Sequence, residues 1–140
     1  MKKLLLIGLI SVFINASEIP DLLKEGFESY KNSGAKSALK AWLKRSPIGE
    51  NNEEALAQSI QFRKLEELYG KFVDYELFKS SSLGSKTTFY LIVMNYEKGA
   101  LFTRFLIYKT PKNKEVLLSF KFNNMPLKVW PKQIVYNLKD

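Results

Sequence analysis

Two residue types that supply much of protein chemistry are missing from this 140-residue chain, which contains no histidine and no cysteine. Their absence excludes cysteine nucleophiles, Cys- or His-based zinc sites, disulfides and the Ser-His-Asp triad. Acid–base chemistry would fall to carboxylates, lysines or tyrosines. Asp74 and Glu76 lie two apart on a predicted strand and could form a carboxylate pair. Because a polar outer strand face explains the same spacing, we predict no catalytic residue, no metal site and no cofactor.

Arg104 lies in the middle of an otherwise apolar predicted strand. A guanidinium in such a place needs a partner, because burying an unpaired charge is costly. It could bind a carboxylate or a phosphate in a bidentate manner. Alternatively, Arg104 could pair with an internal acid, or its aliphatic stem could carry the guanidinium to the surface.

Several large side chains could line a small-ligand cavity between helices and sheet. Such cavities are mostly apolar and carry a few polar tips. Simple core packing is the alternative role for each side chain, and no glycine spacing typical of phosphate binding occurs. The candidate ligand-binding residues are Trp42, Tyr90, Met94 and Tyr96.

The first 16 residues have the organisation of a secretory signal peptide. A positive start at Lys2 and Lys3 precedes an apolar run that ends near Ile14, and Ala16 offers a small residue for cleavage. The run is shorter than the roughly 20 apolar residues that span a bilayer. We therefore predict a bacterial protein exported to the periplasm or secreted, without stable membrane insertion after cleavage. Residues 17–123 would form one domain, with 124–140 as an irregular tail packed over it.

The formal net charge is +8, yet the basic residues are scattered, with no run longer than two. A basic exported protein could meet anionic lipid, cell-wall polymers, acidic proteins or nucleic acid. A solvated, lysine-rich surface explains the pattern more simply, and we predict no nucleic-acid partner.

The chain divides by secondary structure, with helical periodicity over residues 18–70 and strand alternation over 71–123. We predict α+β architecture: three N-terminal helices packed on one face of a curved four-stranded antiparallel meander. The third helix would be capped by Asn51 or Asn52 and carry an apolar stripe of Leu56, Ile60, Leu65, Leu68 and Tyr69. The predicted strands are 72–78, 87–96, 101–110 and 116–122, with a flexible connection at 80–85.

Turn positions predict which side chains share a sheet face. A two-residue turn at Lys98-Gly99 would pair Tyr96 with Leu101, and a turn centred on Lys112-Asn113 would pair Phe105 with Phe120. The core face then carries Tyr90, Ile92, Met94, Leu101, Phe105, Ile107, Leu118, Phe120 and Phe122.

The opposite face is predicted to be apolar as well, whereas a solvated antiparallel face is normally polar. Either the tail around Leu127, Val129 and Trp130 covers it, or a partner does, such as a second copy of the chain. The candidate interface residues are Phe89, Leu91, Val93, Phe102, Arg104, Leu106 and Tyr108, with Leu117 and Lys121 on the same face.

The Tyr69-Gly70 junction, the strands at 88–96 and 102–108, and the closing Phe120-Lys121-Phe122 resemble the NTF2-like group of cone-shaped α+β domains, which overlaps the cystatin-like fold. The resemblance implies a dimer through the open sheet face and a pocket between helices and sheet. Enzymatic members of the group usually place an Asp-His or similar acid–base pair in that pocket, and this chain has no histidine.

We therefore expect an exported, non-catalytic binding domain that is homodimeric or bound to another exported protein, and that holds a small apolar or anionic ligand or a protein. The second hypothesis is an inhibitor or immunity-type protein that blocks another exported enzyme and uses the basic segment Lys109–Lys114. The third is a histidine-free enzyme, which would need a pocket with two carboxylates or a Tyr–Arg pair.

Overall fold

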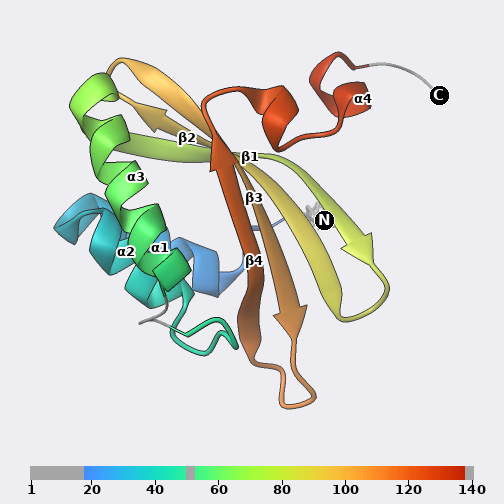
Figure 1. The fold of residues 1–140 in the computed structure, drawn as a ribbon. Helices are drawn as coiled ribbons and strands as arrows, with labels where there is room; N and C mark the ends of the chain where they lie inside the picture. The colour runs from blue at the N-terminus through green and yellow to red at the C-terminus, as the bar shows by residue number, and fades with distance from the viewer. Residues whose placement is uncertain (1–17, 50–52, 138–140) are drawn as a thin grey trace, which may run out of the picture.

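The described part of the chain, residues 18–49 and 53–137, folds in this computed structural model as three helices followed by a four-stranded antiparallel sheet (Figure 1). This confirms the predicted α+β class. The predicted signal peptide, residues 1–16, and the predicted caps Asn51 and Asn52 lie outside the described residues. In chain order the elements are α1 (Asp21–Ser33), α2 (Ala35–Trp42), α3 (Glu53–Tyr69), β1 (Phe72–Leu83), β2 (Thr87–Tyr96), β3 (Gly99–Lys109), β4 (Glu115–Asn123), the 3-10 helix η1 (Pro126–Lys128) and α4 (Lys132–Val135).

Helix α1 ends at a glycine. Gly34 has φ +91°, a conformation that other residues adopt only at a cost, and its amide donates to the Tyr30 carbonyl. The chain then turns directly into α2. Gly26 allows the two helices to meet, because a Cβ at this position would overlap the Trp42 indole.

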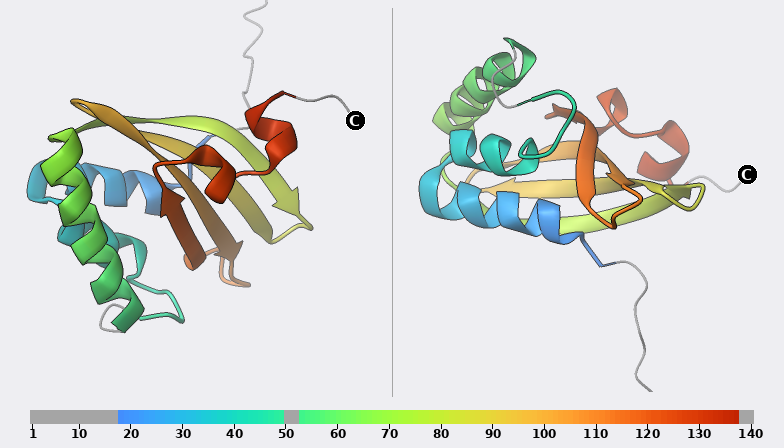
Figure 2. Two further views of the ribbon diagram at one scale, coloured as in Figure 1. Left: turned by 45° about the horizontal axis from the view of Figure 1, so that its top comes forward. Right: turned by 90° about the horizontal axis from the view of Figure 1, so that it is seen from below.

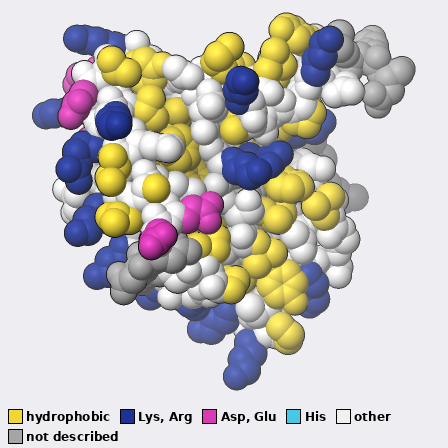
Figure 3. Space-filling view, viewed as in Figure 1, with side chains coloured by type: hydrophobic (Ala, Val, Ile, Leu, Met, Phe, Trp, Pro, Cys, Tyr) yellow, Lys and Arg dark blue, Asp and Glu magenta, His cyan; other side chains and the backbone are white. Residues whose placement is uncertain are grey.

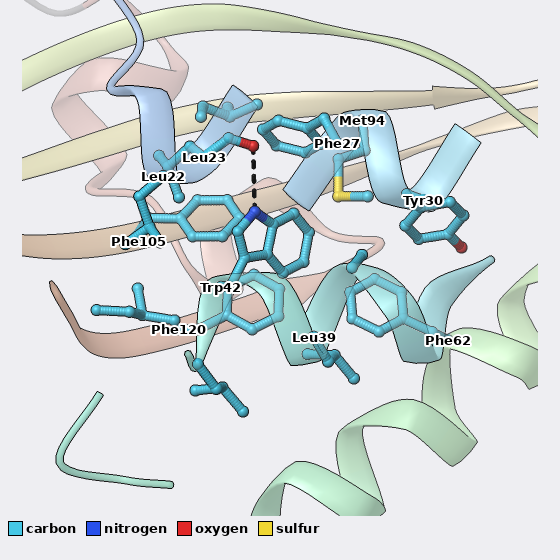
Figure 4. Close-up of a cluster of buried hydrophobic side chains, with 14 of the residues drawn as sticks. Leu22, Leu23, Phe27, Tyr30, Leu39, Trp42, Phe62, Met94, Phe105 and Phe120 are labelled. Atoms are coloured by element: carbon cyan, nitrogen blue, oxygen red, sulfur yellow. Dashed lines mark hydrogen bonds between the residues drawn. The ribbon is translucent and has the colours of Figure 1, made fainter. Parts of the chain in front are cut away.

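The main core lies between these helices and one face of the sheet. Trp42 is fully buried, and its indole nitrogen donates to the Leu23 carbonyl at 3.2 Å (Figure 4). Rings of Phe27 and Phe105 pack edge-on against it at centroid distances of 5.1 and 5.0 Å. Such edge-to-face contacts add to the free energy gained by burying apolar area.

The predicted apolar stripe of helix α3 is confirmed in part. Leu65 and Tyr69 pack against the core, but Leu56 and Leu68 are 63 % and 70 % exposed and Ile60 is also exposed. The buried side chains of the helix are Ala55 and Phe62 instead. Because α1 and α2 already cover the sheet face, α3 packs beside the edge strand β4. There Phe62 stacks on Phe122 at 4.4 Å.

Strands β2 and β3 pair two residues away from the predicted register. The two-residue turn is Glu97-Lys98, so Tyr96 pairs with Gly99 and Met94 with Leu101. The predicted pairing of Tyr96 with Leu101 is therefore wrong. An even shift leaves every side chain on its predicted face, because side chains alternate with a period of two.

A bulge in β4 exchanges the predicted sheet faces of Leu117 and Leu118. Phe105 pairs with Phe120 as predicted, but Ile107 pairs with Leu117. A bulge moves the following residues to the opposite face. Leu117 is therefore fully buried in the main core, which the sequence analysis had assigned to Leu118.

Two further segments are more regular than predicted. Strand β1 continues to Leu83 through most of the predicted flexible connection, with bulges after Phe72 and Leu77. Bulges of this kind discourage pairing at a sheet edge. The tail, predicted to be irregular, forms η1 and α4, and it lies across the sheet from the helices (Figure 2).

Candidate functional site

The four candidate ligand-binding residues lie together on the helix side of the sheet. Trp42 and Met94 are fully buried and Tyr96 is 5 % exposed, while Tyr90 packs at the margin of the core. Burial raises the pKa of Tyr90. Their side chains fill the core, which is the alternative role that the sequence analysis left open.

The seven candidate interface residues lie on the opposite face, hereafter the second face, and the tail divides them. Val129 and Trp130 bury Leu91 and pack against Val93 and Phe102. The Trp130 indole stacks on Phe78 at 4.9 Å and donates to the Thr103 carbonyl at 2.9 Å.

The part of the second face beyond the tail stays partly exposed, and we call it the open half-face. Strand pairing arranges its side chains in two rows that cross the four strands in the order β1 to β4. The first row is Ser81, Phe89, Leu106 and Ser119, and the second is Leu83, Thr87, Tyr108 and Val116. Leu83 is 54 % exposed, and Phe89, Leu106 and Tyr108 are half-buried.

A third row borders the open half-face; the tail covers it at Leu91, and its other three positions carry cations. Lys79 pairs with Leu91, Leu91 with Arg104, and Arg104 with Lys121. We call Lys79, Arg104 and Lys121 the cation row. Like charges directly opposite each other on a sheet are destabilising, and Arg104 and Lys121 are such a pair.

Arg104 is held by an aromatic ring. Its guanidinium carbon lies 5.4 Å from the centroid of the Phe89 ring, within the range of a cation–π interaction. Within residues 18–49 and 53–137, none of the cation row forms an ion pair with a carboxylate. An internal acid, one of the alternatives considered for Arg104, is therefore not found among these residues. Figure 3 shows hydrophobic side chains gathered over the lower right of the molecule with Lys and Arg beside them.

The sequence carries a signal for this surface that a search for basic runs misses. Residues 77–140 contain eleven Lys and Arg against three Asp and Glu, whereas residues 18–76 contain nine against eleven. The positive charge is therefore segregated to the strands and the tail. One carboxylate in the strand segment, Glu115, accepts a hydrogen bond from the Leu22 amide.

Asp74 and Glu76 do share the second face, at the end that lies away from the open half-face. Asp74 pairs with Asn95 and accepts a 2.8 Å hydrogen bond from its side-chain amide, and Glu76 pairs with Val93. Both carboxylates are exposed.

A concave site lies elsewhere, between the end of α1, the end of α3 and the start of β1. This cleft has a volume of about 540 Å³. Its walls carry Arg63, Glu66, Glu67 and Glu97, and Tyr30 lies at its floor. It therefore contains the residue types that an enzyme without histidine would need.

The hydroxyl groups beneath the cleft are linked in a chain. Tyr30 donates to Glu66 Oε1 at 2.5 Å, and the Tyr96 hydroxyl lies 3.1 Å from that of Tyr30. Burial raises the pKa of both tyrosines, and the neighbouring Glu66 carboxylate raises them further. Both phenols are therefore protonated near neutral pH, and their hydrogen bonds join α1, α3 and β2.

Comparisons with protein-family models, with curated protein sequences and with solved structures returned no match. Across the described residues no cluster of Asp and Glu could hold a metal ion. The described helices include none long and apolar enough to cross a membrane.

Proposed function

We propose that the protein is an exported, non-catalytic interaction domain that binds an acidic protein through the open half-face. One observation carries the proposal: an apolar sheet surface is bordered by three cations that no described carboxylate neutralises. Complementary charge accelerates encounter and fixes the orientation of a partner.

The resemblance to NTF2-like domains adds support by analogy. Helices packed on one face of a four-stranded antiparallel sheet are compatible with that group, in which the open sheet face commonly forms an interface. A fold alone does not define a function, so the chemistry of the surface must define the partner.

A second copy of the chain suits the open half-face less well than an acidic protein. The tail has already covered Leu91, Val93 and Phe102. Self-association would also bring two cation rows onto one interface, where the juxtaposition of like charges is unfavourable.

A catalytic role for the cleft is less well supported than binding. Tyr30 and Tyr96 have the raised pKa of buried phenols and direct their hydroxyls at each other and at Glu66. A general acid or base works best with a pKa near the operating pH. We therefore assign these hydroxyl groups a structural role.

Site-specific photo-crosslinking tests the proposed function. A photoreactive phenylalanine analogue replaces Phe89 in the open half-face or Leu56, the exposed residue of α3. The purified chain is then incubated with the exported protein fraction of its own cells. We expect an adduct with an acidic protein from position 89 that disappears in the Arg104→Gln, Lys121→Gln double variant and in high salt.

Three outcomes would overturn the proposal. Adducts that form only from position 56 would move the interface to α3. An adduct between two copies of the chain would make the occupant a second protomer. Adducts that persist in the Arg104→Gln, Lys121→Gln double variant and also in high salt would show that charge does not direct binding.

A further inference from the structure

We infer that the part of the partner seated on the open half-face is a short amphipathic α-helix with an acidic stripe, lying across the four strands. This inference rests on the proposed function and specifies the shape and chemistry of the partner. Three features of the face support it: its size, the spacing of the cation row, and the position of the apolar rows beside that row.

The size of the face favours a single segment. Four strands about 4.8 Å apart and three rows about 6.7 Å apart frame a rectangle of roughly 14 by 13 Å. Standard protein interfaces bury about 800 Å² on each partner, several times the roughly 190 Å² of this rectangle. An α-helix about 10 Å wide needs about three turns, or 16 Å, to cross it.

The spacing of the cation row matches the repeat of a helix. Lys79 and Arg104 are separated by two strand spacings, about 9.6 Å, and Arg104 and Lys121 by one, about 4.8 Å. Helical residues at i, i+7 and i+11 rise by about 10.5 and then 6 Å. Three carboxylates at these positions would each reach one cation.

An extended segment matches the same row less well. Side chains on one side of a β-strand repeat every 6.6–6.8 Å, roughly, so successive carboxylates would overshoot the pair Arg104 and Lys121. A strand also gains its affinity from backbone hydrogen bonds at a sheet edge, whereas Arg104 lies on the inner strand β3.

The apolar rows complete the match. Phe89 and Leu106 lie one row from the cations, with Leu83 and Tyr108 beyond them. A helix whose acidic stripe follows the cation row presents its adjoining stripe to these side chains. Phe89 also holds the Arg104 guanidinium at 5.4 Å, which reduces the freedom lost when a carboxylate binds.

Binding of a designed probe tests the inference directly. The probe is a fluorescent helical peptide with glutamates at i, i+4, i+7 and i+11 and leucines at i+1, i+5, i+8 and i+12, which place the two stripes side by side. Fluorescence anisotropy is measured on the chain of residues 17–140. We expect saturable binding that weakens about tenfold or more in Arg104→Gln and in Lys121→Gln, and that is unchanged in Lys36→Gln, an exposed lysine of α2.

Two matched peptides separate charge from shape. Replacing the four glutamates by glutamine is expected to reduce the affinity about as much as Arg104→Gln does. Placing a proline in the middle of the acidic peptide prevents the helix while keeping its charge.

If the helical peptide and the proline peptide bind equally well, the bound segment is not required to be helical and the inference fails. If Lys36→Gln weakens binding as much as Arg104→Gln does, the peptide does not bind at the cation row. If no peptide binds while position 89 still gives its charge-dependent crosslink, the helix inference fails and the proposed function stands. If both experiments fail, the proposed function fails as well.

Discussion

Tyr30, Tyr96 and Glu66 show how single polar groups are accommodated in this largely aromatic core. Tyr30 and Tyr96 are 3 % and 5 % exposed, so an unpaired hydroxyl on either would cost about 1–3 kcal/mol. Each hydroxyl has a partner, and the chain ends on the carboxylate of a residue that faces the cleft. Tyr96 was a predicted ligand-binding residue, whereas Tyr30 and Glu66 were not predicted to meet it, because their proximity depends on how α1 and α3 pack.

The raised pKa values of these two tyrosines predict a loss of stability in alkali. A folded-state pKa above the unfolded value of about 10 means that the folded chain holds the proton more tightly. The stabilisation is therefore complete below pH ~10 and is lost as the pH rises above it. We therefore expect the free energy of unfolding, measured with urea, to fall between pH 8 and pH 11. The fall should be about 2–3 kcal/mol larger in the wild type than in the Tyr30→Phe, Tyr96→Phe double variant.

The control for this measurement is Tyr136→Phe, which removes a hydroxyl from a side chain that is 55 % exposed. It should leave the loss between pH 8 and 11 unchanged. Identical losses in the wild type and the double tyrosine variant would show that the two buried hydroxyls do not couple folding to pH.

The helices and strands show which structural features a sequence can predict. Gly34 and Gly70, which both have positive φ, mark the ends of α1 and α3. Residues with high β-propensity mark the strands β2 and β3. The side-chain faces of β2 and β3 were predicted correctly despite the register error, because the error was an even number of residues. Local patterns were sufficient for these features.

Features that depend on neighbouring elements could not be predicted in the same way. The bulge that buries Leu117 has no local signature. The inward face of α3 is set by Phe62, because only the edge of the sheet was left for this helix to cover. The cation row was equally hidden, since Lys79, Arg104 and Lys121 come from three strands and meet only through pairing.

Trp130 anchors the tail, and we predict that Trp130→Ala releases it. The substitution removes the stacking on Phe78, the edge-on contact with Phe102 and the hydrogen bond to the Thr103 carbonyl. Truncating a buried tryptophan costs about 3–5 kcal/mol, which is more than a short tail can recover from its other contacts. We expect hydrogen exchange at residues 124–137 to increase strongly while the amides of α1 and α2 stay protected.

Tyr136→Ala is the matched control for the tail, because this aromatic side chain is exposed at the far end of the same segment. Its tail amides should exchange at wild-type rates. Unchanged protection of residues 124–137 in Trp130→Ala would show that other contacts hold the tail on the sheet.

At the scale of the whole molecule, charge and apolar surface are distributed unevenly. The helical part is close to neutral, and the surplus of eight positive charges in residues 77–140 lies on the strands and the tail. The tail covers one half of the second face and leaves the half that borders the cation row. This arrangement favours contact with an acidic molecule and opposes contact between two copies.

The oligomeric state follows from this distribution, and we predict that the chain of residues 17–140 is a monomer. Its formal charge is +6 once Lys2 and Lys3 are removed, so copies repel one another at low salt. The tail also covers Leu91, Val93 and Phe102, so these apolar side chains are not available to a second copy. Light scattering over a concentration series is expected to give the mass of one chain at both low and high salt.

The Trp130→Ala variant provides the internal comparison for this measurement. Releasing the tail exposes Leu91, Val93 and Phe102, which joins the two halves of the second face into one apolar surface. We expect the variant to associate as its concentration rises, and more strongly at high salt, where repulsion is screened. A wild type that dimerises while the tail stays protected from hydrogen exchange would instead make a second copy the occupant of the open half-face, and the acidic partner would have to bind elsewhere.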